Sequence, residues 1–463
     1  MKRKKTLLVL CTVLLVAIIG IVAEHAFQKH VDAINKIDEE VFKITADDVT
    51  KLAVTKDGST ATFEKKDDTW TNTSDADFPV NQDYVKEMLS KFESIHASFI
   101  IDNVEDYSQY GLDSPEGKIV FTTADGDKVI TFGAFSTLDT KRYICVDGGS
   151  VYLIDTDLLE NISGKTEDYL DRDSVYNYSQ LTALKASGAS KLNLVYDPDG
   201  KYSYTDTYNY YDVDGEEHKA LSDTKVTSYL NTLTNMNLSE YETYKASEED
   251  LKKYGLDEPT LTLTIKGEVP ADDSDDKDAE VKSKKQKIYF SYKDKADYAY
   301  VNFDGSTIIY KISSDTYDEI VKANYESLRP DEIVSIDWTT VSQISTKIDG
   351  KTYIVDVKTD KNDGNTYTLD GENLKFTTVT TKIDGLYLDK VGEDYKKGTE
   401  ELSFAITLND DNATMVNVVM YQYDGDSCVA AVDGKVVGLC SRSSMSNLRE
   451  EITSSILNKG KED

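Results

Sequence analysis

The side chains that most often carry enzyme chemistry are scarce in this chain. Four histidines and four cysteines occur among its 463 residues. The sequence has no Gly-x-Ser-x-Gly turn, no phosphate-binding P-loop, no His-Glu-x-x-His pair and no Cys-x-x-Cys pair. We therefore predict no catalytic residue, no bound metal and no cofactor. A hydrolase built on two carboxylates is left open, because 85 acidic residues are present and their spatial separation decides such chemistry.

Basic residues are also in short supply. Lysine and arginine total 52 against 85 acidic residues, for a net charge of −33. Nucleic acids are bound by basic surfaces, so this balance excludes a nucleic-acid partner. The acidic loops at 197–200, 212–215 and 360–364 lack the ligand spacing of a calcium loop. We interpret them as hairpin turns on an acidic, self-repelling surface.

Charge is missing altogether from residues 6–23, which are rich in leucine, valine and isoleucine. A helix of this length spans about 27 Å, close to the bilayer hydrocarbon thickness of about 30 Å. The four cations within residues 1–5 predict a cytoplasmic tail. No small-x-small cleavage site follows, which favours an uncleaved anchor over a signal peptide. We expect a single-pass cell-membrane protein with its bulk outside the cytoplasm and a juxtamembrane helix at 24–43.

What the chain does contain is a repeated stretch. Residues 105–115 and 249–259 lie 144 positions apart and are identical at seven of eleven positions. Their shared core is Tyr-Gly-Leu-Asp-x-Pro, formed by Tyr110, Gly111, Leu112, Asp113 and Pro115 in the first copy and by Tyr254, Gly255, Leu256, Asp257 and Pro259 in the second. A match of this length indicates internal repetition.

The repeated motif predicts the end of a short helix and the entry to a strand. The acidic residues that open each copy suit the positive N-terminal end of a helix. Glycine is favoured where a helix ends in a left-handed residue, and the following proline prevents the helix from resuming. Strands are expected next, at 118–122 and 261–265. We interpret the motif as structural and not as a site.

Other features repeat three times. Strand, Asp-Gly turn and strand recur at 143–154, 298–310 and 428–440, each followed by a short helix. Longer amphipathic helices are expected at 81–96 and 222–236, whereas the last third of the chain lacks a clear copy.

Alternating polar and apolar residues in the strands are typical of antiparallel sheet with one wet face. Together with the helices they predict the α+β class. We expect a transmembrane helix followed by three tandem sheet-plus-helix units, the third divergent. The expected borders are 44–173, 174–332 and 333–458, with a disordered insertion at about 266–287 in the second unit.

The Tyr-Gly-Leu-Asp-x-Pro turn before a β-meander, on a chain with an anchor pattern, resembles the DUF4340 family of bacterial proteins, a domain of unknown function. The segments 169–173 and 327–331, each preceding a Val/Ile-rich strand, fit this resemblance. The resemblance is strongest over 44–173 and 178–335. It implies companions of ABC-type export systems similar to gliding-motility transporters, and it supplies no catalytic residue.

From these observations we expect a non-catalytic extracytoplasmic accessory or scaffold subunit that contacts an ABC permease and its ATPase. The chain has no ATP-binding loop of its own, so energy would come from the partner. The first alternative is a module that binds a cell-envelope glycan or another ligand, with the tyrosines between 202 and 211 as its face. The second is the carboxylate hydrolase.

Cys428 and Cys440 stand at the two ends of the last hairpin. With a three-residue turn over Asp433, Gly434 and Lys435 they would be directly opposed, with Cα atoms about 4.5 Å apart and within disulfide range. A two-residue turn would place them on opposite faces. A disulfide and a pair of small buried residues both remain open, and Cys145 has no partner in the pattern.

Overall fold

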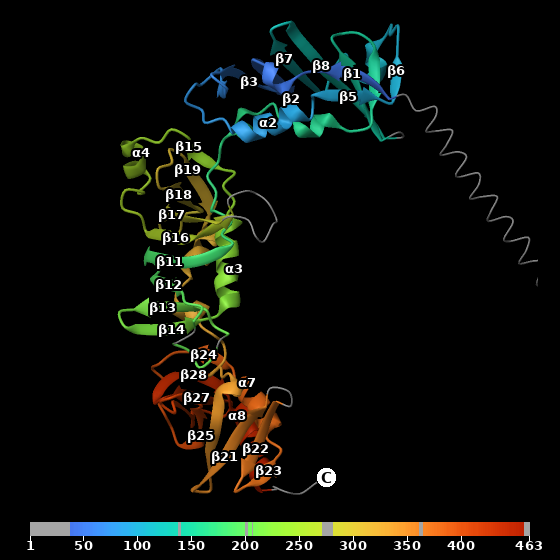
Figure 1. Cartoon of the computed structure of the whole chain (residues 1–463). Coiled ribbons are helices and arrows are strands. Elements are labelled where there is room, and N and C mark those ends of the chain that lie inside the picture. Colours follow the sequence, from blue (N-terminus) through green and yellow to red (C-terminus); the bar gives the residue numbers. More distant parts are fainter. Residues whose placement is uncertain are drawn as a thin grey trace, which may run out of the picture. The chain divides into compact units, whose positions relative to one another are not determined.

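A computed structural model of the chain describes residues 38–137, 140–199, 202–205, 207–270, 281–360 and 364–457. The chain divides into two compact units, Met1–Arg172 and Asp173–Asp463. Figure 1 labels the strands and helices along the sequence. The first unit contains one large antiparallel sheet and the second unit contains two, all built from hairpins.

The first unit has a two-stranded sheet and an eight-stranded sheet. The small sheet pairs β1 (Glu39–Lys43) with β5 (Ser94–Ala97). The large sheet has the order β4-β3-β2-β7-β8-β9-β10-β6. Its strands are β2 (Lys51–Lys56), β3 (Ser59–Lys66), β4 (Thr69–Asn72), β6 (Phe99–Ile101), β7 (Gly117–Thr123), β8 (Gly126–Ser136), β9 (Lys141–Val146) and β10 (Val151–Ile154). The helices are η1 (Ala46–Asp48), α2 (Gln82–Ser90), η2 (Tyr107–Tyr110), η3 (Leu158–Asn161) and η4 (Thr166–Tyr169).

The second unit begins with a nine-stranded sheet in the order β14-β13-β12-β11-β16-β17-β18-β19-β15. Its strands are β11 (Gln180–Gly188), β12 (Leu192–Tyr196), β13 (Tyr210–Asp214), β14 (Glu217–Leu221), β15 (Tyr241–Thr243), β16 (Leu261–Pro270), β17 (Val281–Ser291), β18 (Tyr298–Phe303) and β19 (Ile309–Ser313). Its helices are α3 (Asp223–Thr234), α4 (Glu248–Lys253), α5 (Ser314–Val321) and α6 (Tyr325–Leu328).

A second nine-stranded sheet follows, in the order β23-β22-β21-β20-β25-β26-β27-β28-β24. Its strands are β20 (Val341–Ile348), β21 (Lys351–Asp360), β22 (Gly364–Leu369), β23 (Glu372–Leu374), β24 (Leu388–Val391), β25 (Glu400–Leu408), β26 (Met415–Gln422), β27 (Ser427–Val432) and β28 (Lys435–Ser441). Its helices are η5 (Trp338–Thr340), α7 (Thr377–Asp384) and α8 (Arg442–Leu457).

The three large sheets share one topology. In each, the opening strand pairs with the strand that begins a second meander, as in β2 with β7, β11 with β16 and β20 with β25. A helix follows the first meander in all three sheets. A strand that comes after this helix in the sequence (β6, β15 or β24) then forms the edge of the sheet beside the last strand of the second meander. This common order is the structural form of the repetition seen in the sequence.

The predicted α+β class is wrong, because strands dominate the described residues and form four antiparallel sheets with mostly short helices. The helix predicted at 81–96 ends at Ser90, and Ser94–Ala97 form strand β5. Ile95 and Ala97 are buried there while Ser94 and His96 are exposed. This two-residue period belongs to a strand and not to a helix.

Three further expectations are corrected. Helix α7 occupies the place where no helix was expected in the last third of the chain. The disordered insertion expected at about 266–287 is contradicted at both of its ends, because β16 continues to Pro270 and β17 begins at Val281, and its middle part lies outside the described residues. The juxtamembrane helix is contradicted at Glu39–Lys43, which form strand β1.

The expected transmembrane helix at 6–23 lies outside the described residues, as does the tail at 1–5. Among the residues with described structure, no helix has both the length and the apolar character needed to cross a membrane. The expected anchor, and the single-pass membrane location that was inferred from it, are therefore not supported by the described structure.

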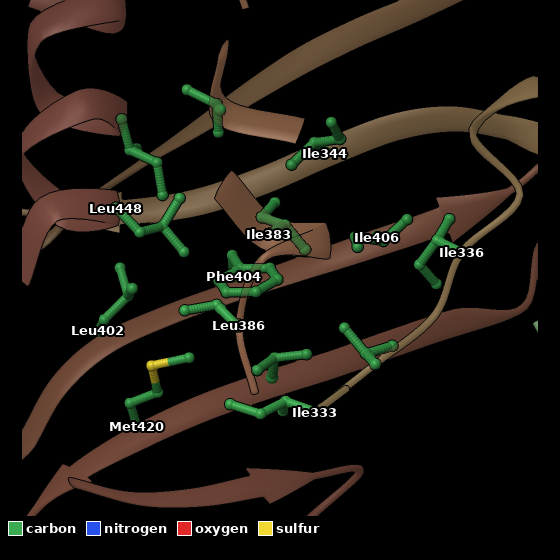
Figure 2. Close-up of a cluster of buried hydrophobic side chains, with 14 of the residues drawn as sticks. Ile333, Ile336, Ile344, Ile383, Leu386, Leu402, Phe404, Ile406, Met420 and Leu448 are labelled. Carbon is green, nitrogen blue, oxygen red and sulfur yellow. The ribbon is translucent and has the colours of Figure 1, made fainter. Parts of the chain in front are cut away.

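Apolar side chains of the third sheet and its helices form one large core. Figure 2 shows Ile383 of α7 and Leu448 of α8 lying over Phe404 and Ile406 of β25. Met420 of β26 belongs to the same cluster, and all five side chains are nearly inaccessible to solvent. Burial of each such side chain contributes about 1.5–3 kcal/mol, so the helices are held on the sheet by this shared apolar face.

Candidate functional site

The first copy of the repeated motif forms a tight turn that ends helix η2. Gly111 has a φ of 69°, in the left-handed region, and its N–H donates to the carbonyl of Ser108 at 3.0 Å. The N–H of Leu112 donates to the carbonyl of Tyr107 at 3.1 Å. The Leu112 side chain is buried in a small cluster with Cys145. The turn therefore closes the helix and places its leucine in an apolar cluster.

The second copy repeats this geometry at the end of α4. Gly255 has a φ of 70°, and the N–H of Leu256 donates to the carbonyl of Leu251 at 2.8 Å. Tyr254 and Leu256 are buried in one cluster. The Tyr254 hydroxyl donates to Glu242 at 2.8 Å. The end of α4 is thus joined to β15, which contains Glu242, by a hydrogen bond as well as by packing.

The other motif residues are less enclosed. Asp113, Pro115 and Asp257 are exposed, whereas Pro259 is half-buried. Tyr110 is also half-buried, with its ring centroid 5.1 Å from that of Tyr143. The motif residues thus lie at a helix end and a chain reversal in both copies.

Sequence reasoning missed a buried arginine beside the first turn. Arg142 on β9 places Nε and Nη2 at 2.5 and 2.7 Å from the two carboxylate oxygens of Asp157. Its Nη1 donates to Glu116 at 2.8 Å and to the carbonyl of Gly133 at 2.7 Å. Gly133 lies in a bulge of β8, so close to the carbonyl of Tyr110 that an added Cβ would be 2.1 Å from it. Arg142 therefore holds the bulge on which the motif turn rests.

Cys428 and Cys440 are directly opposed on β27 and β28, which is the register considered from the sequence. The turn that produces this register is not the three-residue turn considered from the sequence. Val432 pairs with Lys435, so the turn has two residues, and a β-bulge beyond Ala430 restores the alignment. Both cysteines are buried free thiols in this structure, which matches the alternative of two small core residues.

The two thiols give a testable chemical prediction. Burial raises the pKa of Cys428 to about 12 and that of Cys440 to about 11. Because the thiolate is the reactive form, we expect alkylation at about pH 8 to be roughly a hundredfold slower in the folded protein than after unfolding. Mass spectrometry of the alkylated peptides measures both rates. A requirement for reductant before the unfolded protein can be labelled would establish a disulfide instead.

The same shifts predict a direction for stability. The folded state holds the two thiol protons more tightly than the unfolded state, so folding raises both pKa values. The stabilisation from these thiols is therefore complete below about pH 9 and is lost as the pH rises through the folded-state pKa values.

A cavity of about 520 Å³ in the first unit is lined by Asp38, His96, Ser98 and Asp155, among other residues. His96 Nδ1 lies 2.9 Å from Asp38, but no described Ser, Thr or Cys side chain hydrogen-bonds to its ring. Ser98 donates its own proton to a backbone carbonyl and accepts a hydrogen bond from Lys141 at 2.7 Å. Lys141 therefore acts as a donor to Ser98 and not as its base. Within the described residues, no group of three potential metal ligands was found.

A short segment after β12 joins the two sheets of the second unit. The hydroxyl of Tyr204 donates to Asp433 at 2.9 Å, and its backbone carbonyl accepts the N–H of Asp337 at 2.9 Å. The Tyr204 ring also packs against the core of the third sheet. Tyr202 lies nearby but is exposed, and it stacks on His218. The tyrosines that were considered as one binding face thus have different roles.

Tyr208 makes the second connection. Its hydroxyl donates to Glu332 at 3.1 Å and lies 2.6 Å from the hydroxyl of Ser335. Burial raises the pKa of Tyr204 and of Tyr208 to about 12, so both hydroxyls keep their protons. We call these contacts of Tyr204 and Tyr208 the tyrosine joint.

Comparison with known families gives one match. The model of a family described as "Domain of unknown function (DUF4340)" matches residues 70–245 and 212–403, which together span more than half of the chain. Each match begins within one sheet and ends in the next: the first runs from β4 to just beyond β15, and the second from β13 into β25. No curated protein matches this chain.

Proposed function

This chain belongs to the DUF4340 family, a domain of unknown function, and we propose that it is a non-catalytic accessory or scaffold subunit of an ABC-type export system. The proposed partners are a permease and the ATPase that drives it. The chain lacks a P-loop, so any ATP-driven step belongs to the partner.

The observation that carries this proposal is the tyrosine joint. A scaffold acts by holding contact surfaces at fixed separations. Tyr204 and Tyr208, in the loop between β12 and β13, hydrogen-bond to the turn between β27 and β28 and to the segment that precedes the third sheet. Three sheets of one topology also offer several similar surfaces along a single chain. Repeated units are commonly used to build extended binding surfaces.

The composition supports contact over catalysis. The histidine, serine and lysine side chains around the cavity of the first unit are engaged in pairs that leave no nucleophile beside a base among the described residues. The large negative charge favours solubility and a partner with a complementary basic face.

The test is crosslinking of the full chain at native expression, followed by affinity purification and mass spectrometry. We expect a multispanning permease and its ATPase to be enriched together. The double variant Tyr204→Phe/Tyr208→Phe keeps both rings but removes the hydroxyls of the joint, and it should lower the recovery several-fold if a rigid joint is required.

Tyr387→Phe/Tyr423→Phe is the matched control, because both of these tyrosines are exposed. It should recover the partners as the unaltered chain does. Enrichment of neither subunit by the unaltered chain would overturn the proposal. Equal recovery with the joint variant and the control would show that the joint is not needed for docking.

A further inference from the structure

Strand β17 continues past the strand that covers its outer side (Figure 1). Its inner neighbour β16 pairs with it as far as Val281. Its outer neighbour β18 pairs with it at Ile288–Ser291, and the N–H of Asp304 extends this ladder by one bond of 2.9 Å to the carbonyl of Lys287. No other described strand pairs with β17. We call residues 281–286, which lack an outer neighbour among the described residues, the free edge.

The backbone of the free edge points toward the side where β18 has ended. In an antiparallel ladder, the N–H and C=O groups of every second residue face the same neighbour. Because the carbonyl of Lys287 faces β18, the backbone groups of Val281, Ser283 and Lys285 face that side as well. No described residue pairs with them there. A row of this kind is a template for an added strand.

The free edge is basic although the chain as a whole is acidic. Residues 281–287 contain four lysines and no acidic residue, whereas the net charge of the chain is −33. Lys282 and Lys284 lie on one face of the strand and Lys285 on the other. No ion pair joins these three lysines to another described residue. Lys285 is directly opposite Lys266 of β16, and like charges in this position repel. Carboxylates placed beside the edge would offset this repulsion.

The equivalent strands of the other two sheets lack such an extension. In both, an aspartate in the closing hairpin donates its N–H to the last carbonyl of the ladder, which belongs to Val129 in β8 and to Asn417 in β26. The carboxylate of the same aspartate accepts the N–H of that residue. Beyond these bonds β8 contains only residues 126–128 and β26 only residues 415–416. The lysine-rich extension is therefore specific to the second sheet and is not a requirement of the shared topology.

We propose that the free edge of β17 binds an extended acidic segment of a partner protein as an added β-strand. Val281, Ser283 and Lys285 supply the backbone hydrogen bonds, and the lysines select carboxylates directly across from them, at Cβ separations of about 4.5–5.5 Å. Edge lysines deter pairing with apolar strands, so an acidic strand is the kind that this edge admits. The interaction does not depend on the proposed permease and ATPase, and the purified protein suffices to test it.

The first measurement is a fluorescence anisotropy titration of a labelled peptide, Glu-Thr-Glu-Glu-Thr-Glu, with the purified full-length protein. The peptide reads the same in both directions, so it places glutamate opposite Lys282, Lys284 and Lys285 in either strand orientation. We expect a dissociation constant below about 100 µM at about 50 mM salt. The uncharged peptide Gln-Thr-Gln-Gln-Thr-Gln should bind at least about tenfold more weakly.

A second measurement separates an added strand from loose attraction between charges. Two versions of the acidic peptide carry N-methyl groups on alternate residues, in the two possible phases. The phase that removes the N–H groups facing β17 should lose at least about tenfold in affinity, while the other phase keeps its affinity. Ser283→Pro removes an outward N–H of the free edge without removing a bond to β16, and it should weaken binding several-fold. Ser283→Ala is its matched control and should bind as the unaltered protein does.

Charge variants identify the binding face. Lys282→Glu/Lys285→Glu should weaken peptide binding by at least about tenfold. Lys347→Glu/Lys358→Glu is the matched control, because it makes the same change in net charge at exposed positions of the third sheet and should leave the affinity unchanged. Hydrogen exchange in β16 checks that each variant keeps its hairpin. If Ser283→Pro disturbs that hairpin, the comparison of the two N-methylated peptides decides in its place.

Four results would each overturn the proposal. They are equal losses in the two charge variants, equal binding of the two N-methylated peptides, tighter binding of polyphosphate or of anionic phospholipid vesicles than of the peptide, and no peptide binding at protein concentrations up to about 200 µM.

Discussion

Arg142→Met is expected to destabilise the first unit by about 3–5 kcal/mol, the usual cost of breaking a buried, hydrogen-bonded ion pair. The Arg142 side chain is only 7% exposed and that of Asp157 is 14% exposed, so the abandoned carboxylate is poorly solvated. The carbonyl of Gly133 loses its donor as well. Glu116 is half exposed, and its share of the loss is small because solvent screens it.

Hydrogen exchange read by mass spectrometry suits this prediction, because a chain of two units need not unfold in one step. Protection should fall in peptides from β8 and β9, while peptides from residues 173–457 serve as the internal control. Lys91→Met removes an exposed pair with Glu87 and should cost less than about 1 kcal/mol. A loss below about 1 kcal/mol for Arg142→Met would contradict the role given to this arginine.

The second large effect is expected for Gly111→Ala, which should destabilise the first unit by about 2–5 kcal/mol. Its φ of 69° penalises any side chain. In addition, an ideal Cβ would lie 2.8 Å from the backbone nitrogen of Ala134 and 3.1 Å from its Cβ. The backbone of β8 cannot turn aside as a flexible side chain can, so the turn would have to lift from the bulge.

Two other glycines separate the conformational cost from the packing cost. Gly58 has a φ of 75° with nothing within 4 Å of an added Cβ, so Gly58→Ala should cost only the conformational part, about 1–2 kcal/mol. For Gly255, the closest atom is the hydroxyl of Ser291 at 2.7 Å, which can rotate away. Hydrogen exchange should therefore show the smallest loss of stability for Gly58→Ala, a larger loss for Gly255→Ala and the largest loss for Gly111→Ala. Equal losses at Gly58 and Gly111 would show that the contact with Ala134 is unimportant.

The sequence alone determined features that depend on a few neighbouring residues. Gly111 and Gly255 adopt the left-handed conformation that a helix end requires, and Ser222 caps α3 through the N–H of Lys225. These outcomes follow from the φ range of glycine and from the short reach of a serine hydroxyl. The internal repetition could be recognised in the sequence for the same reason, because each copy of the motif contains the same local signals.

Family membership followed from the repeated motif, yet the class of fold and the placement of elements did not. Ile95 fits an apolar stripe of a helix begun at residue 81, but pairing with Phe42 of β1 makes it a strand residue. The residues near Ile95 contain no signal that identifies Phe42 as its pairing partner. The strand ends at Pro270 and Val281 likewise depend on pairing with each other across the acidic segment between them.

The candidate sites could be predicted least well from the sequence. Arg142 is satisfied by Asp157 and Gly133, while Arg329 borders a cavity, although both occur as single arginines near strands. The difference between them arises from which segments fold against each side chain. Local chemistry thus determined the turns and caps of this protein, and only the tertiary structure decided which buried arginine is paired with a carboxylate and which is not, because Coulomb and hydrogen-bond energies depend on distances that the chain sets across long sequence separations.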